Sequence, residues 1–358
     1  MLPFFTNFIK RDQFGFMPGS STISCLLHLQ NSLAYYLNSS AITAISVISF
    51  DLQRAFDSLP HNLLLRKLLQ FLPRNLCMFL SSYLSCRTQR VKIMDFYSQN
   101  LFIPSGVPQG AILSPLLFNS FINDLYFGED CKLFKYADDT TIVIPHYTDS
   151  VTTDIECKVN IMEKWCTENS LFLNKAKTQI MTYRKNKSIK LHQNHTKEMR
   201  ILGVCFNENF KWDSQINRVC KKAAQNIHIL AQLKKTVSKK DLLVLYKSLI
   251  EAVLLYGGPL YASLPFHLEK KCRKIYNRCH FLICGTQCNC LESPAVSRKN
   301  QSLKLYINAA SDSNHALHPI IPPRMPNSNR FRQPVSVNER CKQCFIAQLT
   351  EMANKHGL

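Results

Sequence analysis

The stretch KLFKYADDTTIVI, residues 132–144, places two adjacent aspartates between two apolar runs that are typical of β-strands. Asp138 and Asp139 therefore lie at the tip of a predicted β-hairpin. Asp is also a common turn residue, because its carboxylate can hydrogen-bond the backbone. The dipeptide alone leaves two interpretations open, a polar turn or a functional site, and its surroundings must decide between them.

The segments around this hairpin alternate between strand and helix patterns. Residues 41–51, AITAISVISFD, are enriched in Ile and Val and predict a buried strand that ends at Asp51. Apolar spacing predicts helices over residues 21–38 and 154–169. Residues 90–103 predict a pair of strands, and QIMTY predicts another strand. This order predicts an α+β fold in which an antiparallel sheet carries helices on one face.

The second half of the chain is strongly basic. The net formal charge is +20, and residues 1–150 hold 11 Lys and Arg against 10 Asp and Glu, so residues 151–358 hold 33 against 14. Long basic helices are predicted from residue 216, with Ser238 and Asp241 as a capping pair for the second. The asymmetry favours a polyanionic partner for this half. From about residue 291, Pro, Ser and Asn predict a flexible tail.

Fifteen cysteines raise the question of cellular compartment. The N-terminal MLPFFTNFIK has no basic region before its short apolar run, so we expect no signal peptide, reduced thiols and an intracellular protein of cytoplasm or nucleus. No apolar run reaches the roughly 18–20 residues that span a bilayer, so we expect no membrane partner. Cys284, Cys288, Cys290, Cys341 and Cys344 lack paired half-sites with a nearby His, and no zinc site is predicted.

Three carboxylates follow predicted strands. Asp51 ends one strand and Asp138 and Asp139 end another, so adjacent strands of one sheet would bring them within several ångströms. Such a cluster favours divalent cations, and Mg²⁺ prefers a few carboxylates with water and substrate phosphates. Two ions about 3.5–4 Å apart would stabilise the oxygens of an in-line phosphoryl transfer. Asp57, directly before Ser58-Leu59-Pro60, is expected to be a helix cap instead.

Five segments follow in order: FDLQRAFDSLPH (50–61), SGVPQGAILSPLLF (105–118), YADD (136–139), LFLNKAKTQIM (171–181) and ILGV (201–204), preceded by QFGFMPGSST (13–22). This series resembles the reverse transcriptases of non-long-terminal-repeat retrotransposons, closest to the jockey and I-factor type. The resemblance extends from about Gln13 to Gly285. It implies a right-hand polymerase with partial fingers (1–44), a palm (45–206), a helical thumb (207–290) and a flexible tail (291–358).

The resemblance also implies roles for residues of the palm. Asp51, Asp138 and, less directly, Asp139 would bind two Mg²⁺ ions, with the Leu52 carbonyl as a further ligand. Lys177, or alternatively Lys175, matches the lysine that protonates the pyrophosphate leaving group. The residues implied to contact the nucleotide or template are Phe56, which lies under the sugar and rejects a 2′-hydroxyl, Gly106 and Gln109.

The nucleic-acid duplex would be held by residues further along the chain. Leu202 and Gly203 match the hairpin that grips the primer strand. Basic residues of the predicted thumb would track duplex phosphates. They are Lys221, Lys222, Lys234, Lys235, Lys239 and Lys240.

The implied function is an RNA-directed DNA polymerase for retrotransposition, whose partners are an RNA template, a DNA primer and deoxynucleoside triphosphates. Full-length members carry an endonuclease and complete fingers before QFGF, whereas this sequence begins just before this motif, so we expect no nicking of target DNA in cis. In addition, many members have Arg where Met17 stands. Two alternatives remain: a catalytically inactive nucleic-acid-binding relic of a truncated element, and a Mg²⁺-dependent phosphohydrolase. The phosphohydrolase explains the carboxylates but neither SGVPQG nor the basic helices.

Overall fold

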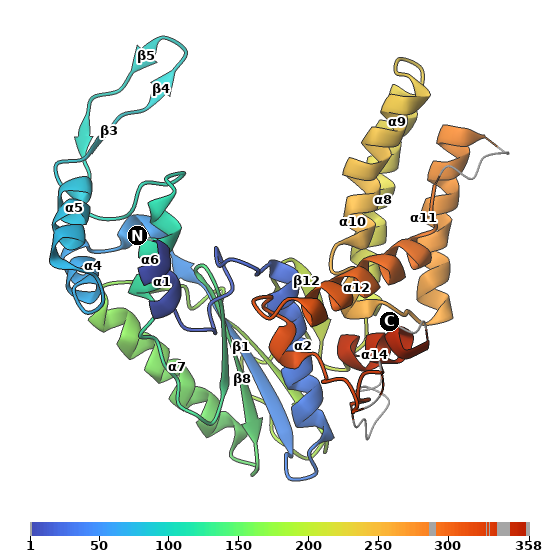
Figure 1. The fold of residues 1–358 in the computed structure, drawn as a ribbon, viewed down its shortest axis with the longest axis horizontal. Helices are drawn as coiled ribbons and strands as arrows, with labels where there is room; N and C mark the ends of the chain where they lie inside the picture. Colours follow the sequence, from blue (N-terminus) through green and yellow to red (C-terminus); the bar gives the residue numbers. More distant parts are fainter. Residues whose placement is uncertain (1, 286–290, 327, 329, 335–343, 356–358) are drawn as a thin grey trace. The chain divides into compact units, whose positions relative to one another are not determined.

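The computed structural model describes residues 2–285, 291–326, 328, 330–334 and 344–355 (Figure 1). The chain divides into two compact units. Unit 1 contains residues 1–25 and 43–195, and unit 2 contains residues 26–42 and 196–358.

A four-stranded antiparallel sheet forms the centre of unit 1, in the order β10-β1-β8-β7. Val47 of β1 lies opposite Val143 of β8 and Met181 of β10, so the central strand is paired along both edges. This arrangement confirms the predicted α+β fold with an antiparallel sheet. The strands are β1 (Ala44–Phe50), β7 (Lys132–Tyr136), β8 (Asp139–His146) and β10 (Gln179–Arg184).

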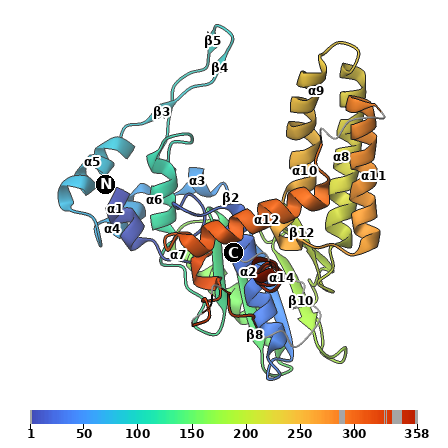
Figure 2. The ribbon, with the colours of Figure 1, turned by 45° about the vertical axis from the view of Figure 1, so that its right-hand side comes forward.

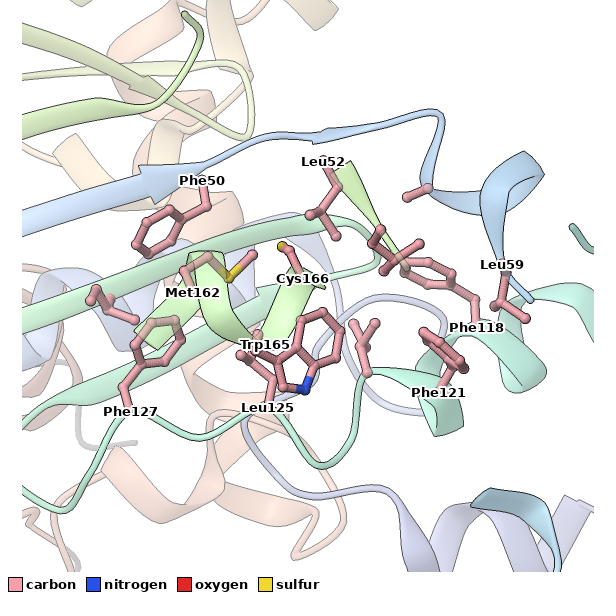
Figure 3. Packing of buried hydrophobic residues seen from close by; sticks show 14 of the residues in the cluster. Phe50, Leu52, Leu59, Phe118, Phe121, Leu125, Phe127, Met162, Trp165 and Cys166 are labelled. Carbon is pink, nitrogen blue, oxygen red and sulfur yellow. The ribbon is translucent and has the colours of Figure 1, made fainter. Parts of the chain in front are cut away.

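Helices pack against one face of this sheet through apolar side chains. Phe50 of β1, Phe118 and Trp165 belong to one buried cluster (Figure 3), and the Phe50 ring stacks on that of Phe127 with centroids 5.6 Å apart. The cluster lies beneath the end of β1 that leads into Asp51. The helices of unit 1 are α1 (Leu2–Phe8), α3 (Ala55–Ser58), α4 (His61–Leu68), α5 (Arg74–Leu84), α6 (Leu113–Phe121) and α7 (Val151–Glu168).

A narrow β-ribbon extends from unit 1 between α5 and α6, and both views show it standing away from those helices (Figures 1 and 2). It confirms the strand pair predicted over residues 90–103. Its strands are β3 (Thr88–Gln89) paired with β6 (Leu101–Phe102), and β4 (Lys92–Ile93) paired with β5 (Phe96–Tyr97). A separate short pair in unit 1 joins β2 (Leu52–Gln53) to β9 (Phe172–Leu173).

Unit 2 is largely helical, and α8, α9, α10 and α11 lie side by side in both views (Figures 1 and 2). Ile227 of α8, Tyr246 of α9 and Cys279 of α11 share one buried cluster. The elements of unit 2 include β11 (Glu198–Ile201), β12 (Val204–Asn207), α8 (Asp213–Leu233), α9 (Lys239–Tyr246), a π-helical turn (Lys247–Glu251), α10 (Ala252–Leu255), a 3₁₀ turn (Gly258–Tyr261), α11 (Phe266–Cys284), α12 (Pro294–Ser311), a second 3₁₀ turn (His318–Ile320) and α14 (Phe345–Lys355).

The predicted capping pair stands at the start of α9. The Ser238 hydroxyl accepts from the Asp241 backbone N–H and donates to the Asp241 carboxylate at 2.7 Å. The helix α2 (Thr22–Asn38) begins one residue after the predicted start at Ser21. From Leu26 onward it belongs to unit 2, where the Gln30 amide donates to the carbonyl of Leu260 at 2.9 Å.

The structure differs from the expected flexible tail after residue 291. Ser293 caps α12, and Pro294 occupies its first turn, which is the usual order of a helix start. The Tyr306 hydroxyl of α12 lies 2.9 Å from that of Thr350 in α14. The Pro- and Ser-rich composition therefore marked a helix beginning as well as loops, and the prediction of an unstructured tail is wrong for α12 and α14.

The cysteines of the described residues differ from expectation at one position. Cys284 is disulfide-bonded, which corrects the prediction of a reduced thiol there. Eleven other cysteines of the described part of the chain are free thiols. Cys288, Cys290 and Cys341 lie outside the described residues. No helix within the described ranges has the length and apolar character needed to cross a membrane.

Candidate active site

Asp51, Asp138 and Asp139 lie at the same edge of the sheet in unit 1. Phe50, the last residue of β1, is opposite Thr140 of β8. Antiparallel pairs continue residue by residue, so Asp51 follows opposite Asp139, the first residue of β8. Asp138 lies in the two-residue turn between β7 and β8. The strand ends therefore meet as the sequence predicted.

The charges of these carboxylates influence one another. Burial, followed by the charges of Asp138 and Asp51, raises the pKa of Asp139 to about 6. Burial also raises the pKa of Asp138; its own backbone hydrogen bond opposes this change, and the charge of Asp51 reinforces it. At neutral pH the edge concentrates negative charge, and a bound divalent cation would relieve that repulsion.

The oxygens at this edge suit a hard divalent cation without forming a closed cage. Within the described residues, no three Asp, Glu, His or Cys side chains are grouped so that they could hold one metal ion. Mg²⁺ commonly takes one or two carboxylates and completes its shell with water and substrate phosphates. Asp51 and Asp138 are half-buried, so their oxygens stay accessible. The donor set therefore fits Mg²⁺ held jointly with a phosphate substrate.

The turn between β9 and β10 holds the backbone of Asp51. The Asn174 N–H donates to the Asp51 carbonyl at 2.8 Å, and the adjacent Leu52 pairs with Leu173. Lys177 Nζ lies 3.5 Å from Asp51 Oδ2. Lys175 instead forms an ion pair with Glu163 at 2.8 Å. Of the two lysines proposed from the sequence, the structure places Lys177 beside the carboxylates.

The SGVPQG loop packs against the segment that follows β1. The Gly106 N–H donates to the Leu59 carbonyl at 2.7 Å, and the Val107 N–H donates to the Phe56 carbonyl at 2.9 Å. Gly106 has a φ of +83°, and a Cβ there would lie 2.6 Å from the Asp57 carbonyl oxygen. A side chain would therefore clash with backbone, so glycine is required for this close approach.

Two predicted nucleotide-contacting residues, Phe56 and Gln109, are associated with Asp57. Phe56 precedes Asp57 in the chain, and Gln109 hydrogen-bonds to it from the loop. The half-buried Phe56 ring stacks on Phe118 with centroids 4.3 Å apart. The Gln109 side-chain amide donates to Asp57 Oδ1 at 2.9 Å. Asp57 lies inside α3, and the following α4 begins after Pro60 without a side-chain cap. The expectation that Asp57 caps a helix is therefore wrong, because its carboxylate instead holds Gln109.

The remaining predicted residues belong to unit 2. Leu202 and Gly203 form the turn between β11 and β12, where the Tyr256 hydroxyl donates to the Leu202 carbonyl at 2.6 Å. Gly203 has a φ of +84°. The six lysines predicted to contact phosphate are all exposed, two on α8 and four around the α8–α9 connection; they are Lys221, Lys222, Lys234, Lys235, Lys239 and Lys240.

Sequence reasoning noted QFGF but gave its residues no role at the site. In the structure Gln13, Phe14 and Gly15 contact β7 and the YADD turn directly. The signal was available in part, because a glycine such as Gly15 permits a close backbone approach. The residue that Gln13 contacts could not be predicted, since more than a hundred residues separate Gln13 from Ala137 along the chain.

Comparison with known proteins identifies the class. A family model described as "Reverse transcriptase (RNA-dependent DNA polymerase)" matches residues 1–206. Because this match covers more than half of the chain, the chain belongs to the reverse transcriptase family. Within that family it is distantly related to the RNA-directed DNA polymerases of non-long-terminal-repeat retrotransposons, as the sequence resemblance indicated.

Three curated proteins of Drosophila melanogaster show this relationship. The "Probable RNA-directed DNA polymerase from transposon BS" is 24% identical over 268 residues, or 68% of this chain and 29% of the relative. The "RNA-directed DNA polymerase from mobile element jockey" is 24% identical and covers 74% of this chain and 31% of its own length. The corresponding transposon X-element protein is 22% identical over 77% of this chain and 32% of its own length. The chain thus spans about a third of these relatives.

Among solved structures, the chain is similar to telomerase from Candida Tropicalis. One such structure, in complex with a TWJ fragment of telomeric RNA, has a TM-score of 0.41 and 14% identity, covering 80% of this chain and 50% of that chain. Apo telomerase from Candida Tropicalis has a TM-score of 0.41 over 86% of this chain and 55% of that chain, again with 14% identity.

Proposed function

We propose that this chain is the polymerase domain of an RNA-directed DNA polymerase, which adds deoxynucleotides to a primer 3′-hydroxyl on an RNA template. The observation that carries the proposal is the sheet edge that brings Asp51, Asp138 and Asp139 together, where the charge of Asp51 raises the pKa of both Asp138 and Asp139. The family match supports the same reaction class. A phosphohydrolase could use these carboxylates, but it would leave the SGVPQG loop on Phe56 and Asp57 without a purpose.

In this proposal Asp51, Asp138 and, less directly, Asp139 would hold two Mg²⁺ ions, with the Leu52 carbonyl as a further ligand. The ions, when bound, stabilise the attacking and leaving oxygens of the in-line transfer. Asp51 is fixed for this task by its backbone bond to Asn174. Lys177 lies beside Asp51 and would act as the general acid toward the pyrophosphate leaving group.

Phe56 and the SGVPQG loop would select and place the nucleotide. Stacking on Phe118 fixes the Phe56 ring, so a sugar bearing a 2′-hydroxyl would meet a rigid aromatic surface. Gln109 is oriented through Asp57, and Gly106 keeps the loop backbone close to that segment. These contacts would place the templating base pair.

The two units would divide the remaining work. Unit 1 contains most of the proposed palm (45–206), and unit 2 contains the proposed thumb (207–290). The turn at Leu202 and Gly203 would grip the primer, and the six exposed lysines of α8, α9 and the connection between them would contact duplex phosphates. Replacing Lys221, Lys222, Lys234 and Lys235 by Gln should then flatten the fall of log affinity with log salt concentration; an unchanged slope would remove this assignment.

Primer extension tests the proposed reaction. Purified chain is given a DNA primer on an RNA template with deoxynucleoside triphosphates and Mg²⁺, alongside Asp138→Asn/Asp139→Asn. We expect extension that chelation of the metal abolishes and that the double variant reduces by at least about 10³-fold, as loss of the main electrostatic stabilisation implies. Asp149→Asn is the matched control, because Asp149 is an exposed residue beyond the opposite end of β8.

The outcomes of this assay separate the functions. Duplex binding without extension, at any Mg²⁺ concentration, would replace the polymerase by an inactive nucleic-acid-binding relic. Phosphate release from small monoesters, lost in the same double variant, would favour a phosphohydrolase. Extension that survives in Asp138→Asn/Asp139→Asn would overturn the assignment of the site.

A further inference from the structure

Residues 12–15, here called the strap, run alongside β7 in unit 1. The Lys135 N–H donates to the Asp12 carbonyl at 2.8 Å, and the Phe14 N–H donates to the Lys135 carbonyl at 2.7 Å. Gln13 lies in parallel register with Lys135. Because β7 is the last strand in the sheet order, the strap takes the hydrogen-bonding edge that β7 leaves open beside the YADD turn.

The Gln13 side chain reaches the turn itself. Its Oε1 accepts the backbone N–H of Ala137 at 3.2 Å and that of Gly15 at 2.8 Å. Ala137 has a φ of 56°, in the left-handed region that is unfavourable for a residue with a Cβ. Contacts that constrain the turn help to offset the cost of this conformation. Gln13 is 4% exposed and supplies one such constraint, one residue before Asp138.

Gly15 brings the strap backbone against the same turn. A Cβ at Gly15 would lie 2.3 Å from the Ala137 nitrogen and 2.9 Å from the Tyr136 carbonyl carbon. Both are backbone atoms, so a side chain could be accommodated only by displacing the turn. The Asn119 amide of α6 donates to the Gly15 carbonyl at 2.8 Å and fixes the strap from its other side. The backbone of the turn therefore lies directly against Gly15, which Asn119 holds in place.

A buried ion pair anchors the start of the strap. Lys135 Nζ lies 3.0 Å from Asp12 Oδ1, and the Lys135 side chain is fully buried. The same ammonium lies 3.4 Å from the carbonyl oxygen of Ile122. A buried ammonium is stable only when a carboxylate and hydrogen bonds compensate it. Moving Asp12 away from Lys135 would therefore cost free energy.

We propose that the strap sets the position of Asp138 and Asp139, and that Gln13 is a positioning residue of the active site. The proposal rests on the proposed polymerase function. It assigns the geometry of the YADD turn to a contact made more than a hundred residues away in sequence, and not to the turn residues alone. The strap touches neither nucleotide nor metal in this scheme and acts through Ala137.

The test compares Gln13→Met, which keeps the volume but removes the acceptor, with Gln70→Met, a change at an exposed residue of the same unit. We expect Gln13→Met to lower kcat by about 10- to 100-fold, as a small displacement of catalytic groups does, while Gln70→Met matches the parent. The KM for nucleotide and the Kd for duplex should stay at the parent values, since neither contact involves the strap. Thermal unfolding confirms that both variants are folded at the assay temperature.

Two further readouts do not depend on activity. Amide hydrogen exchange at Ala137 should accelerate in Gln13→Met and stay protected in Gln70→Met. Mn²⁺ binding, followed by electron paramagnetic resonance, should weaken in Gln13→Met and stay at the parent value in Gln70→Met. Gly15→Ala should reproduce the loss of kcat and of Mn²⁺ binding, because its added Cβ would displace the turn.

The outcomes distinguish the strap from the polymerase proposal. An active parent whose kcat, Ala137 exchange and Mn²⁺ binding are unchanged by Gln13→Met would overturn the strap. A parent that extends no primer would overturn the polymerase function, while the exchange and Mn²⁺ measurements would still decide the strap. A fall in kcat that simply tracks lower thermal stability, with protected Ala137, would make Gln13 structural and would also overturn the proposal.

Discussion

Two hairpins of unit 1 have the same turn and opposite surroundings. Ala137-Asp138 joins β7 to β8, and Met94-Asp95 joins β4 to β5. The first residue of each turn has a positive φ, 56° at Ala137 and 52° at Met94. The YADD turn is held by the strap, whereas Met94 at the ribbon tip is 85% exposed.

The comparison shows that turn chemistry does not distinguish a candidate catalytic hairpin from a surface ribbon. Both are aspartate turns that lack glycine, so a strained residue opens each of them. What differs is what lies behind the strands. Ile142 of β8 is fully buried in the core cluster, while Ile93 and Phe96 of the ribbon are mostly exposed. The packing of β8, together with the strap, gives the YADD turn its fixed place.

The largest expected difference between the hairpins is in stability. Ile142→Ala should lower the free energy of unfolding by about 2–5 kcal/mol, because it opens a cavity in a closed core. Ile93→Ala, the matched change in the ribbon, should stay within about 0.5 kcal/mol of the parent, since its side chain is 67% exposed. Urea denaturation measures both, and comparable losses would show that the ribbon is packed in solution.

The next largest effect concerns the anchor of the strap. Asp12→Ala leaves Lys135 buried without its carboxylate, and we expect a loss of about 2–3 kcal/mol, somewhat below a fully buried pair because Asp12 is partly exposed. Asp12→Asn/Lys135→Met should recover most of that loss, because the uncompensated charge is gone. Asp95→Ala at the exposed ribbon turn is the control and should cost almost nothing. A double variant as unstable as Asp12→Ala would contradict this account.

A smaller effect is a pH dependence that belongs to the buried hairpin. His146 of β8 lies 2.8 Å from both Ser46 Oγ and Asp154 Oδ2. Burial lowers the pKa of His146, although the hydrogen bond and charge of Asp154 oppose that change. The unfolded chain therefore takes up a proton near pH 6.5 while the folded chain does so only at lower pH. His146 therefore lowers stability as the pH drops through this window, while Asp139, whose pKa is raised to about 6, makes an opposite contribution that substitution of His146 leaves in place.

The urea midpoint at pH 7 and at pH 5.5 measures this effect. One proton limits the slope to about 1.4 kcal/mol per pH unit. His146→Gln should remove the His146 contribution and so shift the stability at pH 5.5 upward relative to that at pH 7, whereas His228→Gln, a change at an exposed residue of α8, should leave the difference as in the parent. A difference that is the same in parent and His146→Gln would assign the acid sensitivity to other groups.

The sequence predicted the hairpin and the strand ending at Asp51 because both follow local rules of periodicity and turn composition. Those same rules could not distinguish Lys177 from Lys175, since only the fold shows which of them faces Asp51 and which faces Glu163. Asp57 was misassigned for a similar reason. Its local context predicts a cap, but in the structure its carboxylate accepts a hydrogen bond from Gln109, about fifty positions further along the chain.

The strap and α12 mark two further limits of the sequence. Gln13 acts through a contact with the turn at the edge of the sheet, and long-range pairing leaves no periodic signal in a single chain. In α12 the signal was present, as Ser293 and Pro294 at a helix start, but proline-rich composition further along outweighed it. Composition averages over a segment, whereas a cap is decided by one or two residues.

The smallest expected difference tests whether the ribbon is coupled to the rest of unit 1. Gly at either strained turn residue would relieve about 1 kcal/mol of left-handed strain, partly offset by the greater freedom of Gly in the unfolded chain. Ala137→Gly should therefore raise the free energy of unfolding by roughly 0.5 kcal/mol at most. Met94→Gly should leave it unchanged if the ribbon opens before the core unfolds, because strain already released does not enter the global transition. Equal gains in urea denaturation would mean that both hairpins unfold together with the core, and that exposure alone does not make the ribbon independent.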